Sequence, residues 1–174
     1  MIADFDAEWH IRRLAHEDVP LVRALMLDVI SRLPEPDHFA MDDEPYLHHH
    51  VEEQGEIFGA FLHDQLVAYS VLAFPGTSEK NLAREFGVPE EELPYVGVLD
   101  ATVVHETARG RGLQRHFHEV REQRACERGC LYLYSTVHPD NRPSRLNLEA
   151  AGFVRQFTRL MYGGKLRHCY AKRL

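Results

Sequence analysis

The sequence has few of the features that would assign it to a membrane, secreted or metal-binding class. It contains only three cysteines, Cys126, Cys130 and Cys169, too few for a disulfide framework. Cys126 and Cys130 have no histidines at ligand spacing, which makes them a poor zinc site. No apolar run approaches the ~20 residues of a membrane span. The acidic start MIADFDAEWH lacks the basic and apolar parts of a signal peptide. We therefore expect a cytoplasmic chain with no membrane partner and no metal.

Length and composition indicate an ordinary globular protein. The 174 residues suggest one domain over residues 1–174, and the chain is 44% hydrophobic and 27% charged. Residues 1–90 carry 6 Lys and Arg against 18 Asp and Glu, whereas residues 91–174 carry 14 against 9. The halves could bind ligands of opposite charge, or the distribution could be a chance property of solvated faces. No stacking-aromatic motif accompanies the basic residues, so we expect no nucleic-acid partner.

Hydrophobic periodicity predicts alternating strands and helices in an α+β fold with one central mixed sheet. Two β-rich runs separated by HDQ predict a hairpin. Asp18 is a plausible cap of the first helix, and Asn141 of the last. The expected strands cover 10–14, 56–62, 66–74, 95–105, 130–137, 153–164 and 166–174, and the expected helices follow Asp18, Pro45, Gly112 and Asn141.

The stretch ARGRGLQRHFHE, residues 108–119, places two glycines and two arginines between a strand and a helix. The first N–H groups of a helix have no internal partners, and the helix dipole adds partial positive charge there. Glycines let several N–H groups point into one concavity, which makes an anion cradle. The stretch lacks the Lys-Ser/Thr ending of a P-loop and the three-glycine dinucleotide spacing. A plain structural turn is the alternative.

The order of strand, RGRGL, helix, strand, HPDN, helix and Gly-Phe resembles the GCN5-related N-acetyltransferase (GNAT) superfamily. Its pyrophosphate loop reads Arg/Gln-x-x-Gly-x-Gly/Ala. Arg109 matches the first position and Gly112 the fourth, whereas Gln114 departs from the sixth. Asn141 and the pair Gly152-Phe153 match a second block. The resemblance covers most of the chain except residues 34–55 and 75–94. It implies a mostly antiparallel sheet in which parallel strands four and five splay apart.

The resemblance also implies acetyl-CoA as the acyl donor and a set of residues that bind it. Thr102 and Val104 of the fourth strand would contact the pantetheine arm through their backbone, and Asn141 with Ser144 would bind it near the thioester. The pyrophosphate would lie on backbone N–H groups of residues 109–114, which are Arg109, Gly110, Arg111, Gly112, Leu113 and Gln114. Asn141 could instead be only a helix cap.

Direct attack on a thioester needs a neutral amine, so a nearby group must accept a proton. Asp100 is the first choice because it stands in an otherwise apolar strand. Even spacing puts Asp100, Thr102 and Val104 on one face unless a bulge intervenes. A purely structural carboxylate, held by backbone or an arginine, is the alternative.

The family often places a tyrosine late in the second block to protonate the leaving thiolate, and here Leu148 occupies that position. Water could serve instead, and proximity of the reactants could supply much of the rate. Substitute donors are Tyr132, Tyr134, Ser144 and His138.

The segment before and within residues 45–54 is acidic and rich in histidine. His48 with Glu52, or His49 with Glu53, would form a two-ligand metal site at best. A substrate wall is the better hypothesis, in which acidic side chains suit a cationic acceptor: Asp37, Asp42, Asp43 and Glu44. A solvated acidic loop is equally compatible.

These observations predict an acetyl-CoA-dependent N-acetyltransferase that acts by direct attack of a primary amine of a small molecule or peptide. The alternatives are a non-catalytic acyl-CoA-binding domain and a partner-interaction domain on the same fold. The strands from Phe153 onward could pair across a homodimer. Fold alone does not name the acceptor amine.

Overall fold

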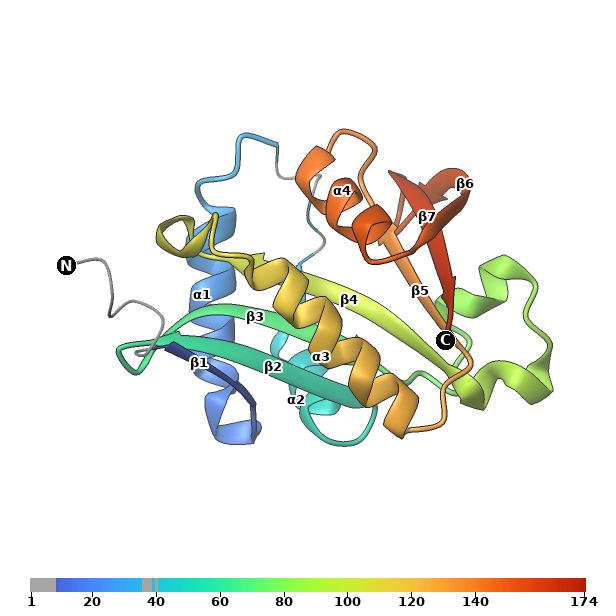
Figure 1. Cartoon of the computed structure of the whole chain (residues 1–174), viewed down its shortest axis with the longest axis horizontal. Helices are drawn as coiled ribbons and strands as arrows, with labels where there is room; N and C mark the ends of the chain where they lie inside the picture. The colour runs from blue at the N-terminus through green and yellow to red at the C-terminus, as the bar shows by residue number, and fades with distance from the viewer. Residues whose placement is uncertain (1–8, 36–38, 40) are drawn as a thin grey trace.

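The computed structural model describes residues 9–35, 39 and 41–174, and a seven-stranded sheet forms its centre (Figure 1). The strand order is β1-β2-β3-β4-β5-β7-β6. Neighbouring strands run antiparallel except β4 and β5, which are parallel. The strands are β1 Trp9–Arg13, β2 Gly55–Leu62, β3 Gln65–Ala73, β4 Val96–Val104, β5 Tyr132–Val137, β6 Val154–Met161 and β7 Lys165–Arg173.

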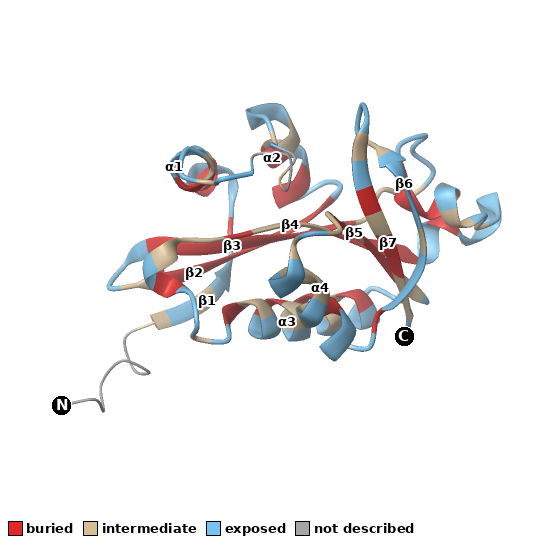
Figure 2. Cartoon of the chain, turned by 90° about the horizontal axis from the view of Figure 1, so that it is seen from above, coloured by how far each residue is buried: buried red, intermediate tan, exposed pale blue. Residues whose placement is uncertain are grey.

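Helices cover both faces of this sheet, which confirms the predicted α+β fold (Figure 2). Helices α1 and α2 lie on one face, and α3 and α4 lie on the other (Figure 2). Their bounds are α1 Val19–Ile30, α2 Glu44–Val51, α3 Leu113–Glu127 and α4 Arg142–Ala150. Short 3-10 helices are η1 His16–Asp18, η3 Leu82–Phe86, η4 Glu90–Tyr95 and η5 Glu106–Ala108.

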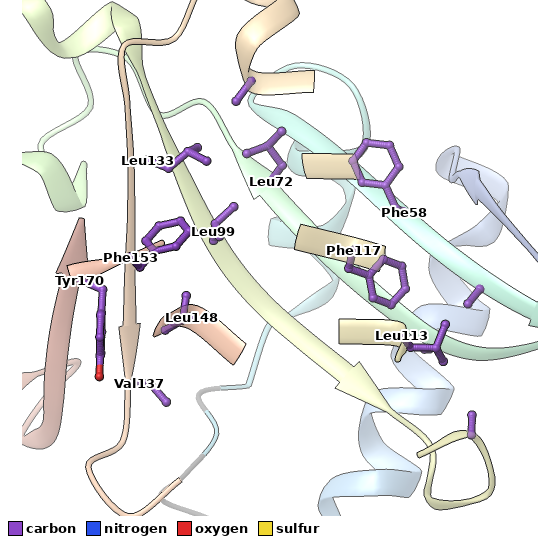
Figure 3. Packing of buried hydrophobic residues seen from close by; sticks show 14 of the residues in the cluster. Phe58, Leu72, Leu99, Leu113, Phe117, Leu133, Val137, Leu148, Phe153 and Tyr170 are labelled. Carbon is purple, nitrogen blue, oxygen red and sulfur yellow. The ribbon is translucent and has the colours of Figure 1, made fainter. Parts of the chain in front are cut away.

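Two hydrophobic clusters hold the helices to the sheet. Helix α1 buries Val22, Met26 and Val29 against the same face of the sheet that α2 covers. On the opposite face, Leu113 and Phe117 of α3 pack on β-strand residues (Figure 3). Full burial of such a side chain contributes ~1.5–3 kcal/mol, so α1 and α3 are fixed mainly by their own apolar stripes.

The predicted caps have different outcomes. Asn141 caps α4, because its Oδ1 accepts from the Ser144 N–H at 3.4 Å. Asp18 makes no side-chain cap on α1. Its carboxylate instead accepts from the Arg12 guanidinium at 2.9 and 3.0 Å and from the Ala15 N–H at 2.8 Å. The strong neighbouring donor therefore displaces the expected cap.

The β2–β3 hairpin is confirmed, with antiparallel pairing from Gly55/Ala73 to Leu62/Gln65. All three cysteines are free thiols. Within residues 9–35, 39 and 41–174, no helix combines the length and the apolar character needed to cross a membrane.

Candidate active site

The site is built where β4 and β5 part. Their parallel pairing runs from Val96/Tyr132 to Leu99/Ser135 and then stops, although β4 continues to Val104. In Figure 3 the two strands diverge toward their carboxyl ends. A cleft of about 970 Å³ opens there, lined by residues of β4, β5, α2, α3, α4 and the β6–β7 turn. The structure thus confirms the splayed pair of strands.

A β-bulge in β4 sets the direction of its side chains. Ser70 pairs with Thr102 but Leu72 pairs with Leu99, so Asp100 and Ala101 together face Val71 on β3. The bulge moves Asp100 away from the face expected from even spacing. Its carboxylate meets α2, whereas the Thr102 hydroxyl lies 2.7 Å from that of Ser70 on the α3 face.

Side chains from α2 hold Asp100. The Tyr46 hydroxyl donates a hydrogen bond to Asp100 Oδ2, and the Tyr46 ring stacks on His50 with centroids 3.9 Å apart. Burial raises the pKa of Asp100, while the hydrogen bond from Tyr46 and the charges of His50 and Arg121 oppose the rise. Burial lowers the pKa of His50. Asp100 is therefore a carboxylate whose proton affinity is raised by its surroundings.

A second carboxylate, Asp42, also lines the cleft. Its Oδ2 is buried and has no hydrogen-bond partner within the described part of the chain. Burial, with the charges of Asp100 and Asp43, raises the pKa of Asp42 to about 7. This end of the cleft is acidic. Of the other acidic residues proposed for the substrate wall, Asp43 lines the cleft and Glu44 does not. Asp37 lies outside the described residues.

The glycine turn leads directly from η5 into α3. Gly110 and Gly112 have φ values of +76° and +74°, a backbone region that glycine adopts without strain. A Cβ at Gly110 would meet nothing within 4 Å, and one at Gly112 would meet only Arg115 Nη2 at 3.9 Å. Gly112 is the N-cap and provides no side-chain cap. The first turn of α3 is thus open to a ligand.

The side chains of the other residues in this turn differ in exposure and in their contacts. The Arg109 side chain is 52% exposed and lies 3.9 Å from Glu106, and Arg111 is half-buried. Leu113 is buried in the core, so only its backbone can face a ligand. Gln114 lines the cleft, and its Oε1 accepts from Asn147 Nδ2 at 2.7 Å. This contact ties the start of α3 to α4.

The predicted residues fall into two groups. Those that line the cleft are Asp100, Thr102, Gln114, Asn141 and Ser144. The rest lie at the end of β4 or in the turn that opens α3, outside the cleft wall: Val104, Arg109, Gly110, Arg111, Gly112 and Leu113. Gln114, which lines the cleft, lies at the start of α3 directly after the turn.

Possible proton donors are also placed by the structure. Leu148 lines the cleft and is buried, but its aliphatic side chain has no acidic proton to donate. Tyr132 and Tyr134 belong to or pack on a further hydrophobic cluster, which includes Leu82 and Leu93. Neither they nor His138 line the cleft.

Tyr162, in the β6–β7 turn, lines the cleft, and its hydroxyl lies 2.9 Å from Thr136 Oγ1. Burial raises the pKa of Tyr162, which keeps the phenol protonated.

Sequence reasoning missed Tyr46, Arg121 and Tyr162. Arg121 lines the cleft from α3 and had a detectable signal: it continues the four-residue stripe of Leu113 and Phe117. Tyr46 and Tyr162 reach the cleft only through tertiary folding. Among the residues the structure describes, no group of three or more potential ligands is placed to hold a metal.

The overall structure is similar to solved acetyltransferase structures. A GNAT-family acetyltransferase from Streptococcus pneumoniae superposes with a TM-score of 0.72 at 17% identity, covering 96% of this chain and 99% of that chain. Ribosomal-protein-alanine N-acetyltransferase from Brucella melitensis gives 0.70 at 20% identity, covering 95% and 99%. A Salmonella typhimurium protein solved with its cofactor acetyl-CoA gives 0.69 at 12% identity, covering 95% and 94%. These likenesses define the fold class.

The family follows from the sequence itself. Residues 22–153 match the model of the acetyltransferase (GNAT) family, and the chain belongs to this family. The match includes the glycine turn and the Asn141 block that carry the resemblance in the sequence. No curated protein sequence matches the chain.

Proposed function

We propose that the chain is an acetyl-CoA-dependent N-acetyltransferase that moves an acetyl group to a primary amine of a small molecule or peptide. The observation that carries this proposal is the cleft between the parted strands, which brings Asp100 together with Thr102, Gln114 and Asn141. Strands from Trp9 to Arg173 share one sheet, which supports a single domain as the unit of activity.

The coenzyme end has a form that fits a pyrophosphate. Open space surrounds Gly110 and Gly112, and backbone N–H groups of residues 109–114 would hold the phosphates, with Arg109 and Arg111 adding charge. Thr102 and Val104 stand on the part of β4 that has no β5 partner, so their backbone would bind the pantetheine arm. Asn141 and Ser144 would bind it from α4. Acetyl-CoA supplies an acetyl group activated as a thioester.

Asp100 accepts the proton that the incoming ammonium must lose. A base works best when its pKa lies near the working pH, and burial shifts the pKa of Asp100 upward, toward that range. Tyr46 fixes the carboxylate by donating to Oδ2. The acidic surroundings that include Asp42 attract a cationic amine.

Tyr162 holds the proton that the departing thiolate takes up. Its hydroxyl stands beside Thr136, which follows the last residue of β5 that pairs with β4. Tyr162 also has a positive φ of +51°, a conformation that is uncommon outside glycine and concentrates at functional sites. This residue takes the place of the tyrosine that Leu148 replaces.

The alternative is a domain that binds acyl-CoA without turnover, and Leu148 is the feature that favours it. Asp100→Ala separates the two functions. In an enzyme, the variant loses acetyl transfer to a panel of amines, measured by release of free thiol, and keeps its affinity for acetyl-CoA. Glu119→Ala, which removes an exposed carboxylate on α3, is the control. Absence of thiol release by the wild type with every amine would contradict the proposed transfer.

The exposed edge of the sheet supports a homodimer. Strand β6 ends the sheet order, and Val154 and Leu160 on it are 61% and 68% exposed. An unpaired edge of this kind readily pairs with a second copy. Sedimentation of the wild type against Leu160→Lys tests this expectation, because a β6 dimer would become monomeric in the variant.

A further inference from the structure

The bulge in β4 creates a problem that the sheet alone does not solve. The ladder between β3 and β4 changes register opposite Val71, and β5 has stopped pairing with β4 at Leu99. Backbone carbonyls at such a place need donors from outside the sheet, since buried carbonyls without partners are costly. The bulge also carries Asp100, so its geometry decides where that carboxylate stands.

Arg121 of α3 supplies the missing donors. Its Nη1 donates to the Val71 carbonyl at 3.0 Å and to the Asp100 carbonyl at 3.3 Å. One of these carbonyls belongs to the bulge itself and the other to the β3 residue opposite it. The residue is only 2% exposed, so one guanidinium joins β3, β4 and α3 inside the core.

A buried guanidinium is an expensive way to satisfy two carbonyls. Nε of Arg121 is buried with no partner in the described chain, and burial lowers the pKa of Arg121 to about 9. An uncharged core residue at this position on the stripe of α3 would avoid that cost. The charge therefore points to a role beyond packing, and Asp100 is the acidic group that attracts it.

We propose that Arg121 is a positioning residue that holds the β4 bulge, and through it the Asp100 carboxylate, in the arrangement needed for acetyl transfer. This inference rests on the proposed function. Helix α3 starts at the glycine turn, so the same helix fixes the coenzyme end through its first turn and the proton-accepting end through Arg121.

The charge of Arg121 also affects the protonation of Asp100. A positive charge favours the carboxylate, so loss of the charge raises the pKa of Asp100 and moves the rise of activity to higher pH. The other groups that act on Asp100 come from every element around it: Asp42 before α2, Tyr46 and His50 on α2, and Tyr162 in the β6–β7 turn. All of them remain in an Arg121 variant.

The test compares Arg121→Met, Arg121→Lys and the control Gln123→Met, an exposed position on the same helix that lies away from the glycine turn. Arg121→Met should lower kcat by at least about tenfold, because small displacements of reacting groups are costly. Its activity should rise at a pH about one unit higher than in the wild type. Arg121→Lys should restore the pH profile but only part of kcat, since an ammonium lacks the planar guanidinium geometry. KM for acetyl-CoA should stay unchanged in all three.

A second readout does not depend on activity. Amide hydrogen exchange at residues 100–102 should be faster in Arg121→Lys than in the wild type, while exchange at residues 96–98 stays the same. A purely structural role predicts equal loss of kcat at every pH with no rescue by lysine, and that result would overturn the proposal. Unchanged exchange at residues 100–102 would overturn it as well. If the wild type transfers no acetyl group, the proposed function fails. The exchange result still shows whether Arg121 holds the β4 bulge.

Discussion

The two ends of the proposed site are built from different chemical groups. At the coenzyme end, the groups proposed to hold the pyrophosphate are backbone N–H groups of one continuous stretch, residues 109–114, shaped by Gly110 and Gly112. At the proton-transfer end, the groups are side chains from separate segments: Tyr46 reaches Asp100 across 54 positions in the sequence. A site made of backbone follows from a local motif, whereas a site made of side chains exists only after folding.

This difference has a functional counterpart. The coenzyme is one molecule with fixed phosphate chemistry, and a local turn at a helix start suffices to bind it. The proton-transfer end must position a carboxylate, a phenol and the acceptor amine together. We therefore expect substitutions at the coenzyme end to change affinity for acetyl-CoA, and substitutions at the proton-transfer end to change turnover.

The largest effect on turnover beyond Asp100 should come from Tyr162→Phe. Removal of the hydroxyl takes away the proposed proton donor and its contact with Thr136, so kcat should fall by about tenfold to a hundredfold. Stopped-flow detection of thiol release, together with calorimetric affinity for acetyl-CoA, measures both quantities. If Tyr162→Phe weakened acetyl-CoA binding as much as it lowered kcat, substitutions at the two ends would not have different effects.

Asn141 should show the opposite pattern, with an intermediate effect. Asn141→Ala should weaken acetyl-CoA binding by about fivefold, equivalent to ~1 kcal/mol, and also lower the melting temperature because the α4 cap is lost. Asn141→Ser retains a capping oxygen, so it should keep the stability and still lose affinity. If both variants bind acetyl-CoA as the wild type does, Asn141 is a cap only.

The smallest effect on function is expected at His118, which lines the cleft from α3 between the two ends. Burial lowers the pKa of His118 to about 3. The unfolded chain takes up a proton at this residue below its ordinary pKa of about 6.5, whereas the folded chain does not. The free energy of unfolding should therefore fall as the pH drops from 6.5 to 3.

Substitution of His118 by Leu should remove that part of the pH dependence. Urea titrations between pH 7 and pH 4 measure the slope, and His116→Leu, an exposed neighbour on α3, is the control. A wild-type slope in His118→Leu would show that this position titrates alike in the folded and unfolded chain.

The sequence predicts the scaffold and the glycine turn before α3 well because both depend on local patterns. The β2–β3 hairpin, the stripe of α1 and the start of α3 after Gly112 all lie where periodicity and turn residues place them. The bulge at Asp100 could not be predicted, since it depends on the register between β3 and β4. Asp18 is a second example. Local rules predict that its carboxylate caps α1, but in the fold this carboxylate accepts a hydrogen bond from Arg12.

Arg121 lies between features that the sequence predicts and features that appear only in the fold. Its spacing from Leu113 and Phe117 puts a charged residue on the buried stripe of α3, which the sequence reveals. The partners of that charge, the carbonyls of Val71 and Asp100, are found only in the folded sheet. Tyr162 has no comparable signal, because it reaches Thr136 from a turn that local rules describe only as Gly-rich.

Calorimetric binding of acetyl-CoA to Gly112→Trp and Gly129→Trp is the most direct test of whether the glycine turn before α3 binds the coenzyme. Both glycines have similar φ values, +74° and +79°, and stand at opposite ends of α3 in open space, so both substitutions strain the backbone equally. The account predicts that the wild type and Gly129→Trp bind alike, and that Gly112→Trp binds at least about tenfold more weakly. Equal affinity of the two variants, or no binding by the wild type, would contradict it.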